Sequence, residues 1–179
     1  EIFLKKNAET GGLLMMGPDC GTAIVNGVPL GFANNVKKGS IGIVAASGTG
    51  LQQVSCLIDR WGGGISQAIG TGGRDLSTKV GGSTMIAGID ALAADSNTEV
   101  IVLISKPPSQ DVACKVLERA AKTDKPVVVN FLGSTVEVPA GAEVTEAKTL
   151  EAAAHAAVRL TGIDVQTPAR HLVTTGELA

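Results

Sequence analysis

The feature that most constrains the fold of this chain is an alternation of short apolar runs with longer segments of helical spacing. Residues 41–46 form one clear run, and apolar residues then recur at positions 51, 54, 57, 58 and 61. A run of β-forming residues predicts a buried strand, whereas a spacing of three and four predicts an amphipathic helix. The pattern predicts strands at 41–46, 65–69, 100–104, 126–131 and 142–145, and helices at 50–61, 82–94, 109–122 and 149–160.

Strands that alternate with helices favour an α/β fold, in which a parallel sheet lies between two helical layers. Because crossover connections are right-handed, we predict a doubly wound sheet whose five strands have the order 2-1-3-4-5. The winding then reverses between the strand at 41–46 and the strand at 100–104. Ligands of such sheets bind beyond the carboxyl ends of the strands at this reversal.

The N-terminal part of the chain follows a different pattern. Residues 1–10 are predicted to form a helix that ends at two glycines, and 13–16 a short buried strand. Two further strand-like pieces, 22–25 and 28–31, flank Asn26-Gly27. That dipeptide is the strongest short signal for a tight hairpin turn. We therefore expect an N-terminal β-hairpin before the doubly wound sheet.

The turn Ser47-Gly48-Thr49-Gly50 joins the first predicted strand of the sheet to its helix. It carries no bulky side chain, so the N–H groups at the start of the helix are uncovered and available to an anion. A plain capped turn, with Ser47 or Thr49 as the N-cap, explains the same residues. Neither the dinucleotide-binding glycine fingerprint nor the lysine-bearing phosphate loop is matched, so both interpretations stay open.

Three loops meet at the predicted reversal of winding, at 47–50, 70–75 and 105–109. Helix-terminal N–H groups, small hydroxyls and two cations in one crevice are typical of an anion site. Lys106 is alternatively an ordinary loop lysine, and Arg74 alternatively pairs with Asp75 or caps a helix. The candidate phosphate-binding or substrate-binding residues are Ser47, Gly48, Thr49, Gly50, Gly72, Gly73, Arg74, Ser105 and Lys106.

Composition excludes several classes of function. The net charge is −2 and aromatic residues make up 2% of the chain, which argues against nucleic-acid binding. No apolar stretch approaches the length of about 20 residues that a membrane-spanning helix needs. Three widely spaced cysteines indicate reduced thiols in a cytoplasmic protein, with no metal site.

Four blocks of sequence, in order, resemble the alpha subunit of succinyl-CoA synthetase and, within that family, its FdrA branch of acyl-CoA synthetases. The blocks are 17–22, 46–50, 72–77 and 105–108, and the likeness runs over roughly residues 12 to 131. The resemblance implies that 1–20 end a preceding CoA-binding Rossmann domain and that 21–162 form a flavodoxin-like CoA-ligase domain. Residues 163–179 would then be a linker or tail.

The resemblance also implies cofactors and partners. CoA would be bound through the missing N-terminal domain, and a nucleotide through a partner subunit of the beta type, in an oligomer. In the family, a phosphohistidine on a glycine-rich loop has its phosphate held by helix N-termini, a role that carries over to Ser47, Gly48 and Thr49. The family's border motif has an asparagine where this chain has Asp19.

This chain departs from the family's pattern at the phosphohistidine itself. Residues 132–139 contain no histidine, and Lys106 stands where the family has the glutamate that orients it. The two histidines of the chain are His155, in an alanine-rich helix, and His171, in the tail. A lysine facing a phosphate strengthens an anion site, whereas a carboxylate there repels. The resemblance therefore implies a phosphate pocket that is kept without the phosphorelay.

Three hypotheses of function follow. The chain is part of an FdrA-type, acyl-CoA synthetase-like enzyme of the ADP-forming class, inactive as a fragment. Alternatively, it belongs to a subunit of an oxamate carbamoyltransferase of allantoin catabolism, which uses carbamoyl phosphate. The third hypothesis is a non-catalytic assembly module that retains the fold and has lost the chemistry.

Overall fold

The apolar runs form one seven-stranded sheet in the order β2-β1-β4-β3-β5-β6-β7. The computed structural model describes residues 1–133 and 141–165. The strands are β1 (Thr22–Val25), β2 (Val28–Gly31), β3 (Lys38–Ala45), β4 (Ile65–Gly70), β5 (Val100–Ser105), β6 (Val127–Phe131) and β7 (Val144–Glu146). The helices are α1 (Ile2–Thr10), α2 (Gly48–Arg60), α3 (Ser83–Ala94), α4 (Gln110–Ala120) and α5 (Leu150–Leu160).

The doubly wound α/β fold and the order of its parallel strands are as predicted. Strands β4, β3, β5, β6 and β7 are parallel neighbours, which is the order 2-1-3-4-5. The prediction is incomplete at one edge, because the N-terminal hairpin continues the same sheet. Strand β1 pairs antiparallel with β4, so that Ala23 lies opposite Ile69. The sheet therefore has seven strands where five were expected.

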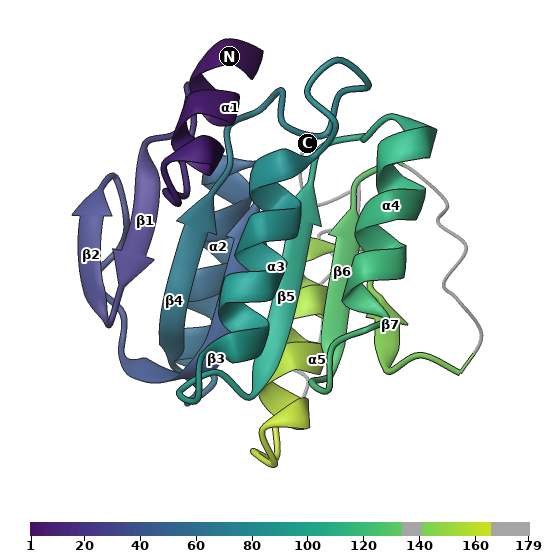
Figure 1. The fold of residues 1–179 in the computed structure, drawn as a ribbon. Coiled ribbons are helices and arrows are strands. Elements are labelled where there is room, and N and C mark those ends of the chain that lie inside the picture. The colour runs from purple at the N-terminus through teal and green to yellow at the C-terminus, as the bar shows by residue number, and fades with distance from the viewer. Residues whose placement is uncertain (134–140, 166–179) are drawn as a thin grey trace, which may run out of the picture.

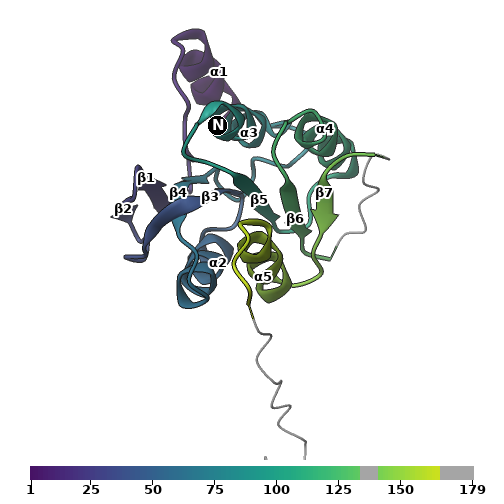
Figure 2. The ribbon, with the colours of Figure 1, turned by 90° about the horizontal axis from the view of Figure 1, so that it is seen from below.

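Helices cover both faces of the sheet, with α2 and α5 on one side and α3 and α4 on the other (Figure 2). Strand β3 is buried between the layers: Ile43 packs with α2 and α5, whereas Val44 packs with α3 and α4. A strand that is buried on both faces has apolar residues without alternation. This burial explains the continuous apolar run in the sequence.

The hairpin turn has the predicted chemistry. Asn26 and Gly27 both have positive φ, 51° and 81°, as the favoured two-residue hairpin turn requires. The Asn26 N–H donates to Oε1 of Gln67 on β4 at 2.8 Å. The turn is thereby attached to the sheet that it extends.

The predicted buried strand at 13–16 is wrong. The segment joins no strand of the described residues, and Leu13 and Leu14 are 69% and 38% exposed. It runs beside α3, where Oγ1 of Thr84 donates to the carbonyl oxygen of Met15 at 3.0 Å. The Leu13 N–H donates to the carbonyl oxygen of Ala8 at 2.8 Å, so the segment begins bonded to the end of α1 and not to a strand.

The carboxyl ends of the central strands lie at one level. Ala45, the last residue of β3, is paired with Gly70 of β4 and Ile104 of β5. In Figure 1 these ends form the upper edge of the sheet, where α1 also lies. The loops that follow the three strands therefore start side by side.

Candidate anion-binding site

The turn after β3 is both a capped turn and an open helix end. Ser47 is the N-cap of α2, and its Oγ accepts the Gly50 N–H at 3.2 Å. This geometry makes Ser47, not Thr49, the cap. The N–H groups of Gly48 and Thr49 belong to the first turn of α2, where the helix itself offers no acceptor. They carry the positive end of the helix dipole.

A cavity of about 320 Å³ lies against this helix end, and we call it the anion cavity. Residues from all three predicted loops line it: Ser47, Gly48, Thr49, Gly72, Gly73 and Lys106. Lys106, which carries the cationic side chain of this lining, is exposed to solvent. The structure thus brings together most of the candidate residues around one space.

Three candidates do not line the anion cavity. Gly50 lies under the helix end, where an added Cβ would be 3.0 Å from Oγ of Ser47. The side chain of Ser105 is buried at the end of β5. Arg74 is turned away: its Nε lies 3.0 Å from Oε2 of Glu1, and its side chain is 64% exposed. In the structure Arg74 thus pairs with the residue that precedes α1, and its role as an anion ligand stays a prediction.

The glycine loop after β4 is narrow because the turn at 17–20 packs against it. A Cβ added at Gly72, which has φ of 90°, would lie 2.3 Å from the carbonyl oxygen of Pro18. One added at Gly70 would lie 2.4 Å from Sγ of Cys20. Only glycine allows this approach and this backbone conformation. The turn at 17–20 thereby forms a wall of the cavity.

Several lining residues were missed by the sequence reasoning. Thr22 and Phe32 come from either end of the hairpin, and Gln52 from α2. Nε2 of Gln52 donates to Oγ1 of Thr22 at 3.0 Å, so the hairpin and α2 are joined at the cavity wall. Asp19 also lines the cavity and adds one carboxylate to its wall. No sequence signal placed the hairpin beside β4, and hence these residues could not be assigned.

The side chain of Asp75 accepts hydrogen bonds from the first turn of α3. Its Oδ1 accepts the Thr84 N–H at 3.2 Å and its Oδ2 accepts the Met85 N–H at 2.8 Å. Asp75 is fully buried. It caps α3 from the loop in front of that helix.

Of the two histidines, only His155 belongs to the described residues, and it does not line the anion cavity. His155 lies on α5 and its ring stacks edge-on with Trp61, at 5.7 Å between centroids. Trp61 follows the far end of α2, a helix of 13 residues, which is about 20 Å long at 1.5 Å per residue. His155 is therefore at the opposite end of α2 from the cavity. His171 and residues 134–139 lie outside the described residues.

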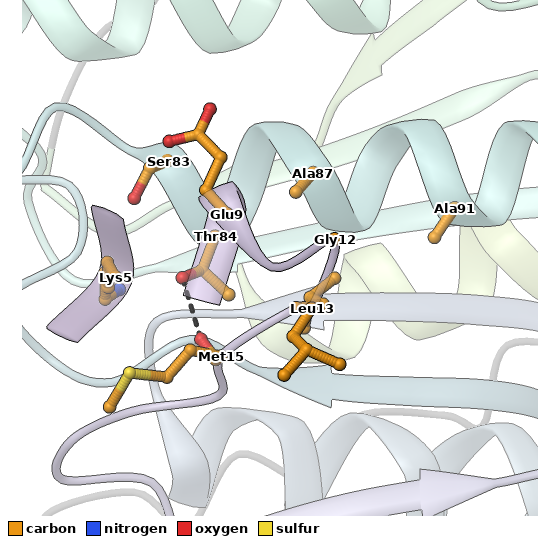
Figure 3. A pocket seen from close by; sticks show the side chains of 10 residues that line it. Lys5, Glu9, Gly12, Leu13, Met15, Ser83, Thr84, Ala87 and Ala91 are labelled. Atoms are coloured by element: carbon orange, nitrogen blue, oxygen red, sulfur yellow. Dashed lines mark hydrogen bonds between the residues drawn. The ribbon is translucent and has the colours of Figure 1, made fainter. Parts of the chain in front are cut away.

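A second cavity, of about 330 Å³, lies between α1, the segment at 12–15 and α3 (Figure 3). Leu13, Leu14 and two alanines of α3 form apolar walls, and Lys5 lies at its edge.

Within residues 1–133 and 141–165, no cluster of three or more His, Cys, Asp or Glu side chains is placed to hold a metal ion. In the same part of the chain, no helix is both long and apolar enough to span a bilayer.

Comparison with known proteins finds a family that this chain matches over more than half of its length. A family described as CoA binding domain matches residues 36–133, from just before β3 to just after β6. Sequence analysis predicts CoA binding through a preceding domain, whereas this match falls on the described sheet. The division of the chain into domains stays a prediction.

Curated relatives extend the comparison. The chain is 61% identical over 132 residues to the uncharacterized protein YahF of Escherichia coli (strain K12), covering 74% of this chain and 26% of YahF. It is 31% identical over 141 residues to the ADP-forming succinate–CoA ligase subunit alpha-2 of Trichomonas vaginalis, covering 75% of this chain and 44% of that subunit. The chain thus spans less than half the length of these relatives.

Solved structures support the fold. The ATP citrate lyase of Methanothrix soehngenii, in complex with citrate and coenzyme A, superposes with a TM-score of 0.63 at 19% identity, over 90% of this chain and 28% of that one. A dinucleotide-forming acetyl-coenzyme A synthetase of Ca. Korarchaeum cryptofilum, in complex with phosphate and ADP, gives a TM-score of 0.58 at 19% identity, over 92% and 32%. At this level of identity the likeness concerns the fold alone.

Proposed function

This chain belongs to the CoA-binding domain family, and from that premise we propose that it is the phosphate-holding part of an acyl-CoA synthetase-like protein. The single observation that carries the proposal is the anion cavity. It gathers the N-terminus of α2, the glycine loop after β4 and Lys106 around one space. The ligand that we propose is a small compound that bears a phosphate or carboxylate group.

The chemistry of the cavity supports an anionic ligand. The free N–H groups of Gly48 and Thr49 and the dipole of α2 favour negative charge. The Lys106 ammonium adds a mobile cation. Lys106 and Asp19 are the two charged side chains that line the cavity, so the helix dipole and the free N–H groups supply the additional positive potential at the helix end. The small side chains of the lining loops leave room for a tetrahedral group.

We further propose that the cavity holds its phosphate compound without a phosphohistidine. Residues 132–139 contain no histidine, and His155 lies at the far end of α2. Lys106 occupies the position that a glutamate holds in the succinyl-CoA synthetase pattern. Without a phosphorylated imidazole to orient, a cation serves the phosphate better than a carboxylate.

The assignment of this chain to one branch of the family rests on four sequence blocks, at 17–22, 46–50, 72–77 and 105–108. We propose that they mark an FdrA-type protein, in which CoA is the cofactor and a nucleotide reaches the site through a partner subunit. The relative from Trichomonas vaginalis is named as a subunit of a ligase. That naming supports partners for this chain and an oligomeric assembly.

A second candidate is the oxamate carbamoyltransferase subunit. It is favoured by the same two departures, Lys106 and the missing histidine. Carbamoyl phosphate and oxamate are both small anions, and transfer between them needs N–H donors and positive charge at the developing oxyanion. Such a reaction needs no phosphohistidine.

The experiment that tests the anion site is a titration of the intact protein with inorganic phosphate, followed by NMR of the Gly48 and Thr49 amides. We expect Lys106→Ala to weaken phosphate binding about tenfold, since a hydrogen bond to a charged group contributes about 1.5–3 kcal/mol. Thr49→Val should weaken it less, because the backbone N–H remains. Lys37→Ala, a surface lysine beside Asp59, is the matched control and should change nothing. Equal affinities for wild type and Lys106→Ala would contradict the site.

Labelled ATP and turnover assays on the intact protein with its partners separate the reactions. An acid-labile phosphohistidine would refute the proposal of a site without phosphorelay. Carbamoyl phosphate-dependent turnover of oxamate would establish the second candidate. Absence of both activities in the complete assembly would support the non-catalytic assembly module.

A further inference from the structure

Helix α1 is attached to the rest of the molecule in an unusual way, through a lysine. Lys5 is the buried residue of α1, at 6% exposure, although apolar residues stand next to it. Of these, Phe3 is 72% exposed and Leu4 is 48% exposed. The helix thus turns a charge inward and leaves its apolar residues in contact with solvent.

The buried ammonium group of Lys5 has defined partners. Its Nζ lies 2.5 Å from Oδ1 of Asp75 and donates to the carbonyl oxygen of Thr71 at 3.2 Å. A third group, Oε1 of Glu1, lies 3.6 Å away. Figure 3 shows Lys5 on α1 beside the N-terminal part of α3. Because Asp75 also caps α3, one carboxylate joins α1, the glycine loop and α3.

The partners of Lys5 lie directly behind the anion cavity. Thr71 stands between Gly70 and Gly72, which both line it. The Thr71 N–H donates to the carbonyl oxygen of Ala45 at 2.9 Å, and the Asp75 N–H donates to that of Gly72 at 3.2 Å. Since a peptide unit is planar, holding the Thr71 carbonyl oxygen also fixes the direction of the Gly72 N–H.

We propose that Lys5 and Asp75 are a positioning pair that sets the backbone of the glycine loop for anion binding. The inference rests on the proposed function, because it concerns the same cavity. Apolar residues of similar volume hold a helix as well as a buried ion pair does, or better. What the pair adds is direction, since charged hydrogen bonds fix peptide orientation whereas apolar contacts do not.

Two variants of the intact protein separate positioning from stability. Lys5→Met removes the ammonium and leaves the Asp75 carboxylate buried without its counter-ion. The double variant Lys5→Met/Asp75→Asn removes both charges, so it should recover part of the stability that Lys5→Met loses. The recovery is partial because the Asn side chain has one acceptor oxygen for the two N–H groups of α3 that Asp75 holds. The double variant still lacks the bond to Thr71. We expect both variants to bind inorganic phosphate about tenfold more weakly, which corresponds to about 1.4 kcal/mol.

The second measurement does not depend on the ligand. We expect NMR order parameters of the amides at 71–73 to fall from about 0.85 to below about 0.6 in both variants. Lys37→Met, which breaks an exposed ion pair with Asp59, is the control and should leave affinity and order parameters unchanged.

The outcomes distinguish the two proposals. Recovery of phosphate affinity together with stability in the double variant would overturn positioning, and so would unchanged order parameters in Lys5→Met. If wild type binds no phosphate, the proposed function fails, and the order parameters alone then decide whether Lys5 positions the loop.

Discussion

Helices α1 and α2 both adjoin the loops of the anion cavity, yet they are held by opposite means. The inner face of α2 consists of Leu51, Val54 and Ile58, which are fully buried against the sheet. The inner face of α1 is Lys5, held by Asp75. Apolar burial is strong and non-directional, whereas a buried ion pair gives little net stability and much orientation. The contrast indicates that α2 supports the fold and α1 adjusts one loop.

The largest effect should come from removing the carboxylate on which α1 depends. Asp75→Ala leaves the Lys5 ammonium buried without a partner and also uncaps α3, and we expect a loss of about 5 kcal/mol in the free energy of unfolding. Urea denaturation measures it. A loss below about 1 kcal/mol would show that α1 is held by something other than the ion pair.

The next effect belongs to α2. Leu51→Ala should cost about 3 kcal/mol, from lost burial and the cavity left behind. The matched change on α1 is Phe3→Ala, which removes an exposed ring and should change the free energy of unfolding by less than about 0.5 kcal/mol. Thermal or urea unfolding of both variants tests the contrast. Equal losses would mean that α1 is also held by apolar packing.

The N-caps of α2 and α5 allow a second comparison, in which the expected losses of stability are smaller. Oγ of Ser47 and Oγ1 of Thr149 accept equivalent N–H groups, at 3.2 Å and 3.0 Å. Replacing either residue with alanine should cost about 1 kcal/mol of stability. Only Ser47→Ala should also weaken phosphate binding, because Ser47 lines the anion cavity. An equal loss of affinity in Thr149→Ala would show that the effect is one of stability.

The smallest effect concerns pH at the other end of α3. The Asn97 N–H, with the hydroxyl of Thr98, lowers the pKa of Asp95, against a smaller opposing contribution from burial. Because the folded-state pKa is depressed, Asp95 stabilises the fold above its unfolded pKa of about 3.9. That contribution is lost as pH falls through the lower folded value. Asp95→Asn should therefore flatten the stability profile below about pH 4, in urea unfolding measured from pH 2 to pH 6.

A large part of the fold followed from local pattern. The strand runs and helical spacing, the Asn26-Gly27 turn and the N-cap at Thr149 depend on residues close together in the chain. Handedness then favoured a doubly wound sheet, and the order 2-1-3-4-5 chosen among such sheets is the one that the parallel strands adopt. The convergence of Ser47 to Thr49, the glycine loop and Lys106 followed from that order, because parallel strands end at the same edge.

Tertiary structure alone decided the rest. Apart from the segment at 13–16, the sequence determined which segments form strands and helices, since side-chain periodicity comes from backbone geometry. It did not determine that the hairpin joins β4, which brings Thr22 and Phe32 to the cavity. Nor did it reveal that Arg74 pairs with Glu1, or that Lys5 is buried against Asp75, 70 residues away. Such pairings depend on which surfaces meet after folding, and no local pattern encodes the partner of a charge.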